Sequence, residues 1–472
     1  MRLALALAAV LAGCTLGPDY QRPAGAVANQ RAANGAFAGG TEAPFTTAGP
    51  PAQWWRLYRD PLLDGLIAQA LRNNTDLRAA AANIARAQAN LDIQEDARWP
   101  QASLGAEWAY DRESGEEHLL DVTLPNSRVY GLEAEVAYQV DLFGQIRRTI
   151  ESGKASLGAA QAAYDATRIT VVAQITLAYV NACSSGREIA VAERSVELQK
   201  ESTALTRRLY QAGRGISLDV TRSAAQEDQV RATLPGLLAQ KQLALYRLAV
   251  LTGKPPVQLP PGVASCMAEP RLDQPIPVGD GAALLRRRPD VRRAEDELHA
   301  ATAQVGVAES SLFPKVALGA SVGSVGLTKD LWKNDTFKFA LGPLISWQIP
   351  DPPRAHAVMH GAQAQVDAAY ARFDGVVLEA LRETESALTV YARDLDRERA
   401  LASAQKNAAK AASDAEALFK TGRQNYLAVL DADRTEIAAD QALAAAQSRT
   451  AADRISLFLA LGGGWQTGAP AR

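Results

Sequence analysis

The most extended pattern of hydrophobic and polar positions in this chain covers residues 145–253 and repeats every seven residues. The repeating apolar or aromatic positions are Ile150, Leu157, Tyr164 and Val171, then Ile175, Ala182, Ile189 and Val196, and on the return Val230, Leu237, Ala244 and Leu251. A seven-residue apolar period requires partner helices packed along its whole length. The pattern therefore predicts a hairpin of two long antiparallel helices, with a tight reversal at Gly213–Gly215.

The length of the first helix limits what this hairpin can be. About 67 residues before the reversal contain no proline, and at 1.5 Å per residue they would form roughly 100 Å of helix. No ordinary globular core is that deep, so we expect a strut or part of a wall. Pro235-Gly236 lies within the returning helix, where we expect a kink.

A second pattern alternates with a period of two and predicts two strands, at 101–112 and 128–141. One face carries Ala102, Leu104, Ala106, Trp108 and Tyr110, then Tyr130, Leu132, Ala134, Val136, Tyr138 and Val140. Such strands are long enough to cross a bilayer with tilt. Glu107, Glu133 and Glu135 fall on the opposite face, as expected for a wet lumen. A soluble hairpin with one solvated face has the same alternation.

The same order of elements occurs twice along the chain, as an internal two-fold repeat. An offset of 214 aligns Asp76 with Asp290, and an offset of 209 aligns Gly213-Arg214 with Gly422-Arg423. Each half reads helix, strand, strand, long helix, tight turn, long helix. In the second half we expect strands at 315–324 and 337–349 and a helical hairpin at 353–461. A pattern that appears in four strands argues against chance and favours the transmembrane interpretation.

These patterns divide the chain into six predicted segments. They are a signal peptide at 1–13, a lipidated extended segment at 14–60, a first repeat at 61–253, a linker at 254–278, a second repeat at 279–461 and a flexible tail at 462–472. The linker is rich in proline and poor in apolar residues, and must lead from one hairpin to the next repeat.

Length, charge and hydropathy narrow the possible functions. The chain has 472 residues and a net charge of −2, which gives no argument for binding nucleic acid. Beyond the first dozen residues we find no apolar run of 18 or more, so any membrane crossing must use strands. Four strands cannot close a barrel, and open edges are not tolerated in lipid. The chain is therefore expected to oligomerise.

The N-terminus has the features of an export signal. Arg2 is the only early charge, and the apolar run from Leu3 ends at Leu11-Ala12-Gly13-Cys14. This sequence resembles the bacterial lipoprotein processing box, in which the cysteine, here Cys14, is lipidated; an ordinary signal peptide is the alternative. Thr15, rather than aspartate, follows and implies the outer membrane of a Gram-negative cell. With only Cys183 and Cys266 remaining, we expect no disulfide framework.

Two patterns that invite an enzymatic interpretation are incomplete. His356 and His360 are spaced i, i+4 on a predicted helix, as metal ligands often are. Position 357 is alanine, so the glutamate of a metalloprotease is missing, and we find no third ligand. Gly253-Lys254 lacks the upstream glycine and the Ser/Thr of a phosphate-binding loop. We therefore predict no metal, no cofactor and no enzymatic activity.

Several local motifs resemble those of one known family. They are Leu284-Leu285-Arg286-Arg287-Arg288-Pro289-Asp290-Val291 with Ala294-Glu295, Leu312-Phe313-Pro314, and Gly17-Pro18-Asp19-Tyr20 after Cys14. The chain resembles the TolC/OprM-like outer-membrane factors, specifically their efflux lipoprotein (NodT) branch. The resemblance implies a mainly α fold with a transmembrane β part. It also implies a homotrimer in which twelve strands form one outer-membrane barrel and twelve helices one periplasmic tunnel.

The resemblance also implies a gate at the hairpin turns. In Val429-Leu430-Asp431-Ala432, Asp431 takes the acidic position of the family's aperture motif, whereas the second acidic position is Ala428. Asp219 takes the matching place in the first hairpin. The candidates for a latch between hairpins are Arg222, Arg423 and Tyr426. These side chains are alternatively plain helix-turn charges or N-caps.

The turns themselves resemble adaptor-docking tips, with Gly213, Arg214, Gly215 and Gly422 in their sharpest parts. The implied partners are a periplasmic adaptor and an inner-membrane pump of the RND type. We therefore expect a passive, gated exit duct for drugs or other small molecules. The alternatives are the outer-membrane duct of a type I protein secretion system and a coiled-coil lipoprotein without a pore.

Overall fold

The computed structural model describes residues 15–40, 44–119, 121–258, 262–272 and 274–463. The expected signal peptide, Cys14 and most of the expected tail lie outside the described residues. The fold is mainly α-helical with one four-stranded sheet and one very small sheet. The chain forms two compact units, the first from residues 1–23, 83–160 and 293–373 and the second from 24–82, 161–292 and 374–472.

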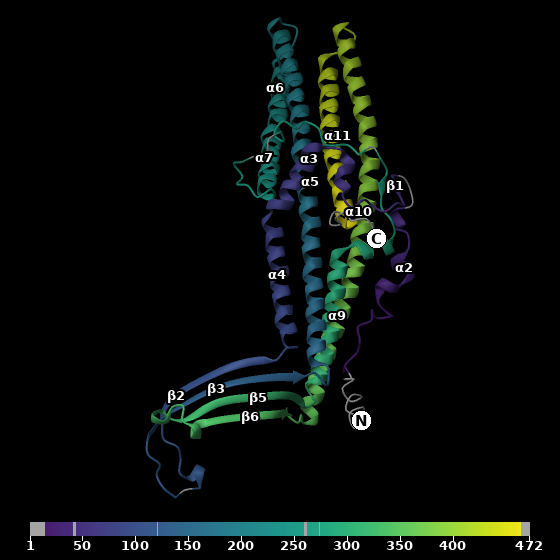
Figure 1. The fold of residues 1–472 in the computed structure, drawn as a ribbon. Helices are drawn as coiled ribbons and strands as arrows, with labels where there is room; N and C mark the ends of the chain where they lie inside the picture. Colours follow the sequence, from purple (N-terminus) through teal and green to yellow (C-terminus); the bar gives the residue numbers. More distant parts are fainter. Residues whose placement is uncertain (1–14, 41–43, 120, 259–261, 273, 464–472) are drawn as a thin grey trace. The chain divides into compact units, whose positions relative to one another are not determined.

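The first unit contains the four-stranded antiparallel sheet, in the order β2-β3-β5-β6 (Figure 1). Its strands are β2 (Gln101–Asp111), β3 (Ser127–Val140), β5 (Lys315–Leu327) and β6 (Phe337–Ser346). Alternation gives the sheet two different faces. One exposes large apolar side chains: Leu104, Trp108, Tyr110, Val136, Leu318, Val322, Phe339 and Leu341. Leu104 is 84% exposed and Leu341 is 83% exposed, so nothing within the described chain covers this part of the face.

Two strand ends differ by three residues from the predicted ranges, and the ends of β2 and β3 differ by one residue. β5 continues to Leu327, three residues beyond the predicted end, because Val129 and its neighbours in β3 pair with this extension. β6 ends at Ser346 rather than at 349, because its partner β5 begins at Lys315, opposite Ser346. Within the described residues, β2 and β6 each pair on one side only, which leaves both edges of the sheet open.

The segment that follows Cys14 is fixed to the first unit by Arg148. The Arg148 side chain is 5% exposed, and its guanidinium donates hydrogen bonds to the carbonyls of Leu16 (3.0 Å) and Gly17 (2.9 Å) and pairs with Asp19 (2.8 Å). The backbone of Thr15 lies against Gly144, where a Cβ would come within 3.0 Å of the Thr15 Cα. This extended segment is therefore held in one place by polar contacts with a buried guanidinium.

Two long helical hairpins lie side by side in Figure 1. The first consists of α5 (Gln145–Gln211), α6 (Ser217–Arg231) and α7 (Leu234–Leu251), and the second of α10 (Pro352–Lys420) and α11 (Tyr426–Ala460). The kink expected near Pro235 is confirmed, because the returning arm of the first hairpin is interrupted at 232–233. α11 has no such break.

The second unit packs these arms around a hydrophobic core. Helix α3 (Pro61–Asn73) begins at Asp60, whose carboxylate accepts hydrogen bonds from two amides of the first turn, and α4 (Thr75–Asp96) follows it. Trp54 is 1% exposed and stacks on Phe458 with ring centroids 4.7 Å apart. The two-residue strands β1 (Phe45–Thr46) and β4 (Ile276–Pro277) pair in parallel, close to α8 (Gly281–Arg287), which leads into α9 (Pro289–Ser310).

Two expectations from the sequence are corrected. A disulfide joins Cys183 in α5 to Cys266, with Cα atoms 4.8 Å apart. The cysteine count could not reveal this pairing, because it depends on the linker folding back onto α5. The second correction concerns α5, which contains an 18-residue stretch apolar enough on average to cross a membrane. Of that stretch 78% is buried inside the chain, which fits a helix packed within the protein.

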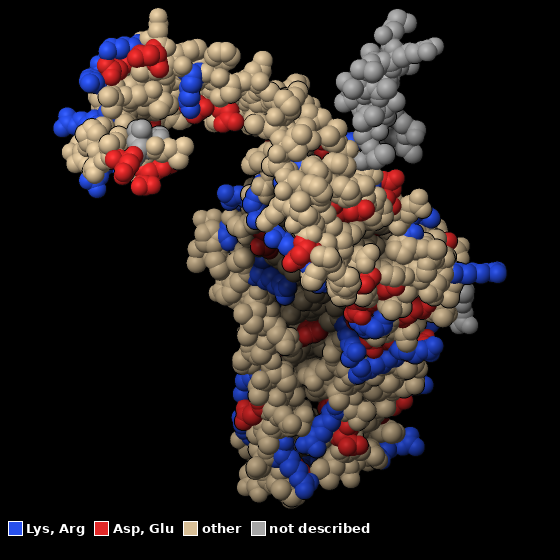
Figure 2. Space-filling model, turned by 90° about the horizontal axis from the view of Figure 1, so that it is seen from below, with Lys and Arg blue, Asp and Glu red and all other residues tan. Residues whose placement is uncertain are grey.

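Charges of both signs are interspersed over the face of the molecule seen in Figure 2. This distribution agrees with the nearly balanced net charge of −2. The face in this view offers no extended single-sign field for a polyanion such as nucleic acid.

Candidate gate at the hairpin turns

The two hairpin turns have the same backbone geometry. Gly213 and Gly422 have φ angles of +71° and +73°, in the left-handed region that favours glycine. The next amide donates back to a carbonyl five residues earlier in both turns, Arg214 to Leu209 (2.8 Å) and Arg423 to Leu418 (2.9 Å). A Cβ on either glycine would meet no atom within 4 Å. These positions need glycine for its backbone conformation and not for lack of space.

Tyr426, at the start of α11, connects the second hairpin to the first. Its side chain is nearly buried, and its hydroxyl donates to the carbonyl of Ser202 in α5 (3.0 Å) and contacts the Ser202 hydroxyl. The ring packs edge-on against Phe419, with centroids 5.3 Å apart. Burial raises the pKa of Tyr426 above its ordinary value, so the hydroxyl stays protonated and remains a donor. Ser202 was not foreseen, because a serine within a helix gives no signal of such a contact.

The charged residues expected at the gate lie at the same turns but do not pair within one chain. Asp431, Arg423 and Arg222 are exposed, and Asp219 is half-buried. Within the described part of the chain, no side-chain hydrogen bond or ion pair joins any of the four. Their roles therefore stay predictions. A charge that the sequence analysis missed lies two residues after Asp431, where burial and the carboxylates of Glu436 and Glu416 raise the pKa of Asp433 to about 6.

The first hairpin is held together near its turn by buried polar side chains. Gln199, Thr203 and Ser223 are each at most 3% exposed. The Gln199 amide donates to the Ser223 hydroxyl (3.2 Å), which also lies 3.1 Å from the Thr203 hydroxyl. Each such hydrogen bond contributes about 0.5–1.5 kcal/mol of net stability and requires a defined geometry. The end of this hairpin is therefore joined by directional contacts.

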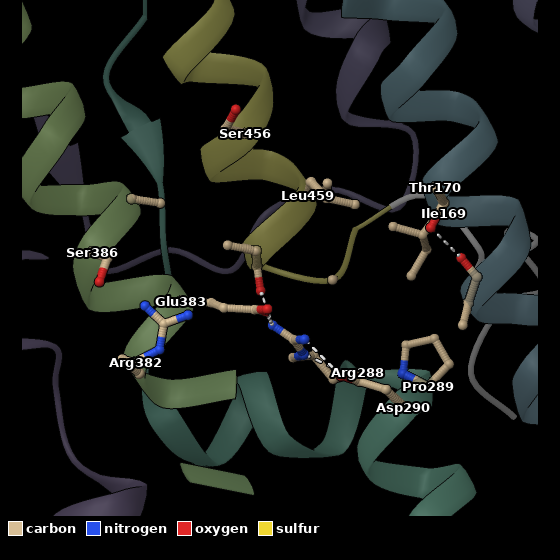
Figure 3. A pocket seen from close by; sticks show the side chains of 14 residues that line it. Ile169, Thr170, Arg288, Pro289, Asp290, Arg382, Glu383, Ser386, Ser456 and Leu459 are labelled. Carbon is tan, nitrogen blue, oxygen red and sulfur yellow. Dashed lines mark hydrogen bonds and ion pairs between the residues drawn. The ribbon is translucent and has the colours of Figure 1, made fainter. Parts of the chain in front are cut away.

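A second polar cluster surrounds Arg288, in the motif that carried the family resemblance (Figure 3). Its guanidinium pairs with Asp290 (2.6 Å) and Glu383 (2.7 Å) and donates to the carbonyl of Ala460 (3.1 Å). Burial alone would lower the pKa of Arg288, but the two carboxylates raise it overall. These contacts tie α9, α10 and the end of α11 together beside a cavity of about 490 Å³. The Arg288 motif therefore has a structural role, which is to hold these three helices together.

The three carboxylates expected to face a lumen lie together on the polar face of the sheet. Glu133 pairs across β5 with Lys338 (2.9 Å), because Gly323, which lies between them in register, leaves the path open. Glu107 and Glu135 share this face by register.

The histidine pair expected on a helix surface lies near the start of α10. His356 and His360 are exposed, with ring centroids 6.0 Å apart. Within the described residues there is no group of three or more metal-ligating side chains arranged around a common point.

Long paired hairpins, open-edged strands with an uncovered apolar face and glycine-capped turns define the class of protein. The chain belongs to the outer membrane efflux protein family, whose sequence model matches residues 66–254 and 282–463. The family resemblance drawn from the local motifs is confirmed. Because the family is one of outer-membrane proteins, we place this chain in the outer membrane.

Individual relatives cover nearly the whole chain. It is 28% identical over 457 residues to nodulation protein T of Rhizobium leguminosarum bv. trifolii, covering 97% of this chain and 96% of that protein. It is 31% identical over 476 residues to the solvent efflux pump outer membrane protein SrpC of Pseudomonas putida, covering 97% and 96%. The solved outer-membrane channel OprN superposes with a TM-score of 0.88 at 33% identity, covering 96% of this chain and all of that one. SrpC and OprN are an efflux component and a channel rather than enzymes.

Proposed function

We propose that this chain is one third of a homotrimeric exit duct, which lets an efflux system export drugs or other small molecules across the outer membrane. The observation that carries the proposal is the four-stranded sheet, with its exposed apolar face and two open edges. Such a sheet is stable in lipid only if neighbouring copies pair with its edges and close a barrel. Three copies would contribute twelve strands and, through two hairpins each, twelve tunnel helices.

The gate of this duct is proposed to lie at the hairpin turns. Three copies of Asp431 around a narrow axis would favour cations and slow anions. Because position 428 is alanine, this ring would lack the second acidic side chain from each copy. Arg222, Arg423 and Asp219 are exposed or half-buried in one chain and are available to pair with a neighbouring copy. The Tyr426–Ser202 contact supports a latch within each chain.

The turns at Gly213, Arg214, Gly215 and Gly422 are proposed as the docking sites of a periplasmic adaptor. The adaptor would connect the duct to an inner-membrane pump of the RND type, because no energy-coupling motif was found in this chain. Lipid on Cys14 would add a second attachment to the membrane. The role of SrpC in solvent efflux supports efflux over protein secretion.

The proposal is tested by labelling the two faces of the sheet in planar bilayers. A water-soluble charged thiol reagent should react with Glu135→Cys on the polar face and lower the single-channel conductance. The matched variant Leu104→Cys, on the apolar face, should be protected by lipid and keep its conductance. Reaction of Leu104→Cys alone, or a purified chain that is monomeric without detergent and never conducts, would show that the proposal is wrong.

A further inference from the structure

A groove of about 780 Å³ lies between the two hairpins near their turns, bounded by α5, α10 and α11. We call it the tip groove. Its apolar walls include Leu198 and Leu205 from α5, Phe419 from α10 and Ile437 from α11. The volume lies in the range of sites for drug-sized molecules and far exceeds that of a hydrated metal ion. The two hairpins are therefore separated here by a space that a ligand could fill.

The charges that line the tip groove are mostly negative. Four carboxylates, Glu201, Glu416, Asp433 and Glu436, line it together with the two cations Arg208 and Lys420, a balance of 2 − 4 = −2. Lys420 is already paired with Glu416 at 2.6 Å. In the part of the chain that the structure describes, Asp433 and Glu436 have neither a side-chain hydrogen bond nor an ion pair. Burial next to Glu436 raises the pKa of Asp433 to about 6, as expected for a carboxylate without a counter-ion.

Gln199 also lines the tip groove. Its side chain is 1% exposed, and its amide nitrogen donates to Ser223. Its amide oxygen is buried and has no hydrogen-bond partner among the described residues. A buried acceptor without a donor costs stability. Because this oxygen has almost no accessible surface, recognition of a ligand in the groove rests on the carboxylates and the apolar walls.

We propose that the tip groove binds an amphipathic organic cation of drug size. The positive group lies between Asp433 and Glu436, and the apolar groups pack on Leu205 and on the ring of Phe419. The aromatic face of Phe419 adds a favourable interaction with the cation. An anion of the same shape is rejected, because it would lie against the carboxylates of Asp433 and Glu436. A bare divalent metal leaves most of the groove empty and its coordination incomplete.

An occupant of the tip groove also acts on the proposed gate, and this consequence alone rests on the proposed function. The Tyr426–Ser202 contact joins the same helices that bound the groove, α11 and α5. A ligand wedged between these helices therefore changes the free energy of breaking the contact. Binding itself requires no pore and is measured separately.

The test uses two ions of matched shape, tetraphenylphosphonium and tetraphenylborate, titrated calorimetrically into the purified protein in a non-ionic detergent, with detergent-only blanks subtracted. Wild-type protein should bind the phosphonium at the micromolar level and show no saturable binding of the borate. The double variant Asp433→Asn/Glu436→Gln should bind the phosphonium at least tenfold more weakly. The control Asp396→Asn removes an exposed carboxylate of α10 outside the groove and should bind like wild type.

The inference is overturned if the double variant, still assembled by size-exclusion chromatography, binds the phosphonium as tightly as wild type. Equal binding of both ions also overturns it, because the groove would then be only an apolar surface. If the double variant loses its assembly, Glu436→Gln alone replaces it under the same criterion. Neither result affects the conductance experiment on the two sheet faces, so the failure of one proposal is distinguishable from the failure of the other.

Discussion

The two hairpins have the same turn but differently built arms. Gly213 and Gly422 share one backbone conformation, whereas the returning arm is two helices of 15 and 18 residues in the first hairpin and one helix of 35 residues in the second. Pro235 accounts for the break, because it lacks an amide hydrogen and its ring crowds the preceding turn. The comparison shows that the glycines determine the geometry of the turn, whereas Pro235 determines whether the returning arm is one continuous helix. We expect the second hairpin, which carries Tyr426, to move as a rigid lever.

The largest predicted effect comes from removing the Cys183–Cys266 disulfide, which joins the first hairpin, but not the second, to the linker. For a sequence separation of 83 residues, loop entropy predicts a loss of about 4–5 kcal/mol in the double variant Cys183→Ser/Cys266→Ser. Thermal unfolding in detergent, with and without reductant, measures it. Reductant should destabilise wild type and leave the double variant unchanged. An unchanged wild type under full reduction would contradict the assignment.

Because the two turns have the same backbone geometry, the same substitution in either turn should lower the free energy of unfolding by the same amount. Gly213→Val and Gly422→Val should each lower the free energy of unfolding of the helical tip by about 1–3 kcal/mol, because a β-branched residue is strained at positive φ. Hydrogen exchange of the turn amides measures the two effects. Gly236→Ala is the matched control with the opposite sign, because this glycine lies inside α7 without positive φ. A large difference between the two valine variants would show that the turns are not equivalent.

The latch predicts a smaller effect on gating. Tyr426→Phe removes the hydroxyl and keeps the ring, so it should lose about 1 kcal/mol of closed-state stability and open about fivefold more often in planar bilayers. Ser202→Ala should have less effect, because Tyr426 still donates to the backbone carbonyl at this position.

Asp431→Ala and Arg423→Ala should raise the single-channel conductance and, for Asp431→Ala, lower the cation selectivity. Wild-type behaviour of all four would exclude these residues from the gate.

The smallest predicted effect depends on pH. Because the pKa of Asp433 is raised to about 6, the native state holds a proton that the unfolded chain releases between about pH 4 and 6, and stability falls as pH rises through this range. Asp433→Asn should therefore stabilise the tip above pH 6, by about 1 kcal/mol after allowance for solvent screening, and have no effect at pH 4. Chemical unfolding at the two pH values measures the difference. A gain at pH 4 that equals the gain at pH 7.5 would contradict the assignment.

Much of this fold could be predicted because its elements are long and periodic. The seven-residue pattern, the glycines of the turns and the kink at Pro235 are local signals that correspond to observed helices and a break. The alternation in 101–112 likewise corresponds to β2, whose polar and apolar faces follow the sequence.

What the sequence did not reveal depends on contacts between distant residues without periodicity. Ser202 and Tyr426 are 224 residues apart, and neither residue type indicates the other. The Cys183–Cys266 bond requires the linker to fold back, and the β1–β4 pair is too short for alternation to be visible. Asp433 was missed because its carboxylate is unusual only through its burial in the tip groove.

Arg148 bears on how the protein is attached to its membrane. Its guanidinium donates hydrogen bonds to the carbonyls of Leu16 and Gly17, two and three residues after Cys14. Thr15 packs against Gly144, four residues after the end of β3. If Cys14 is lipidated as proposed, its acyl chains would enter the bilayer close to the strands. In that case the same contacts would hold the anchor at a fixed place on each subunit of the proposed trimer and restrain its tilt in the surrounding lipid.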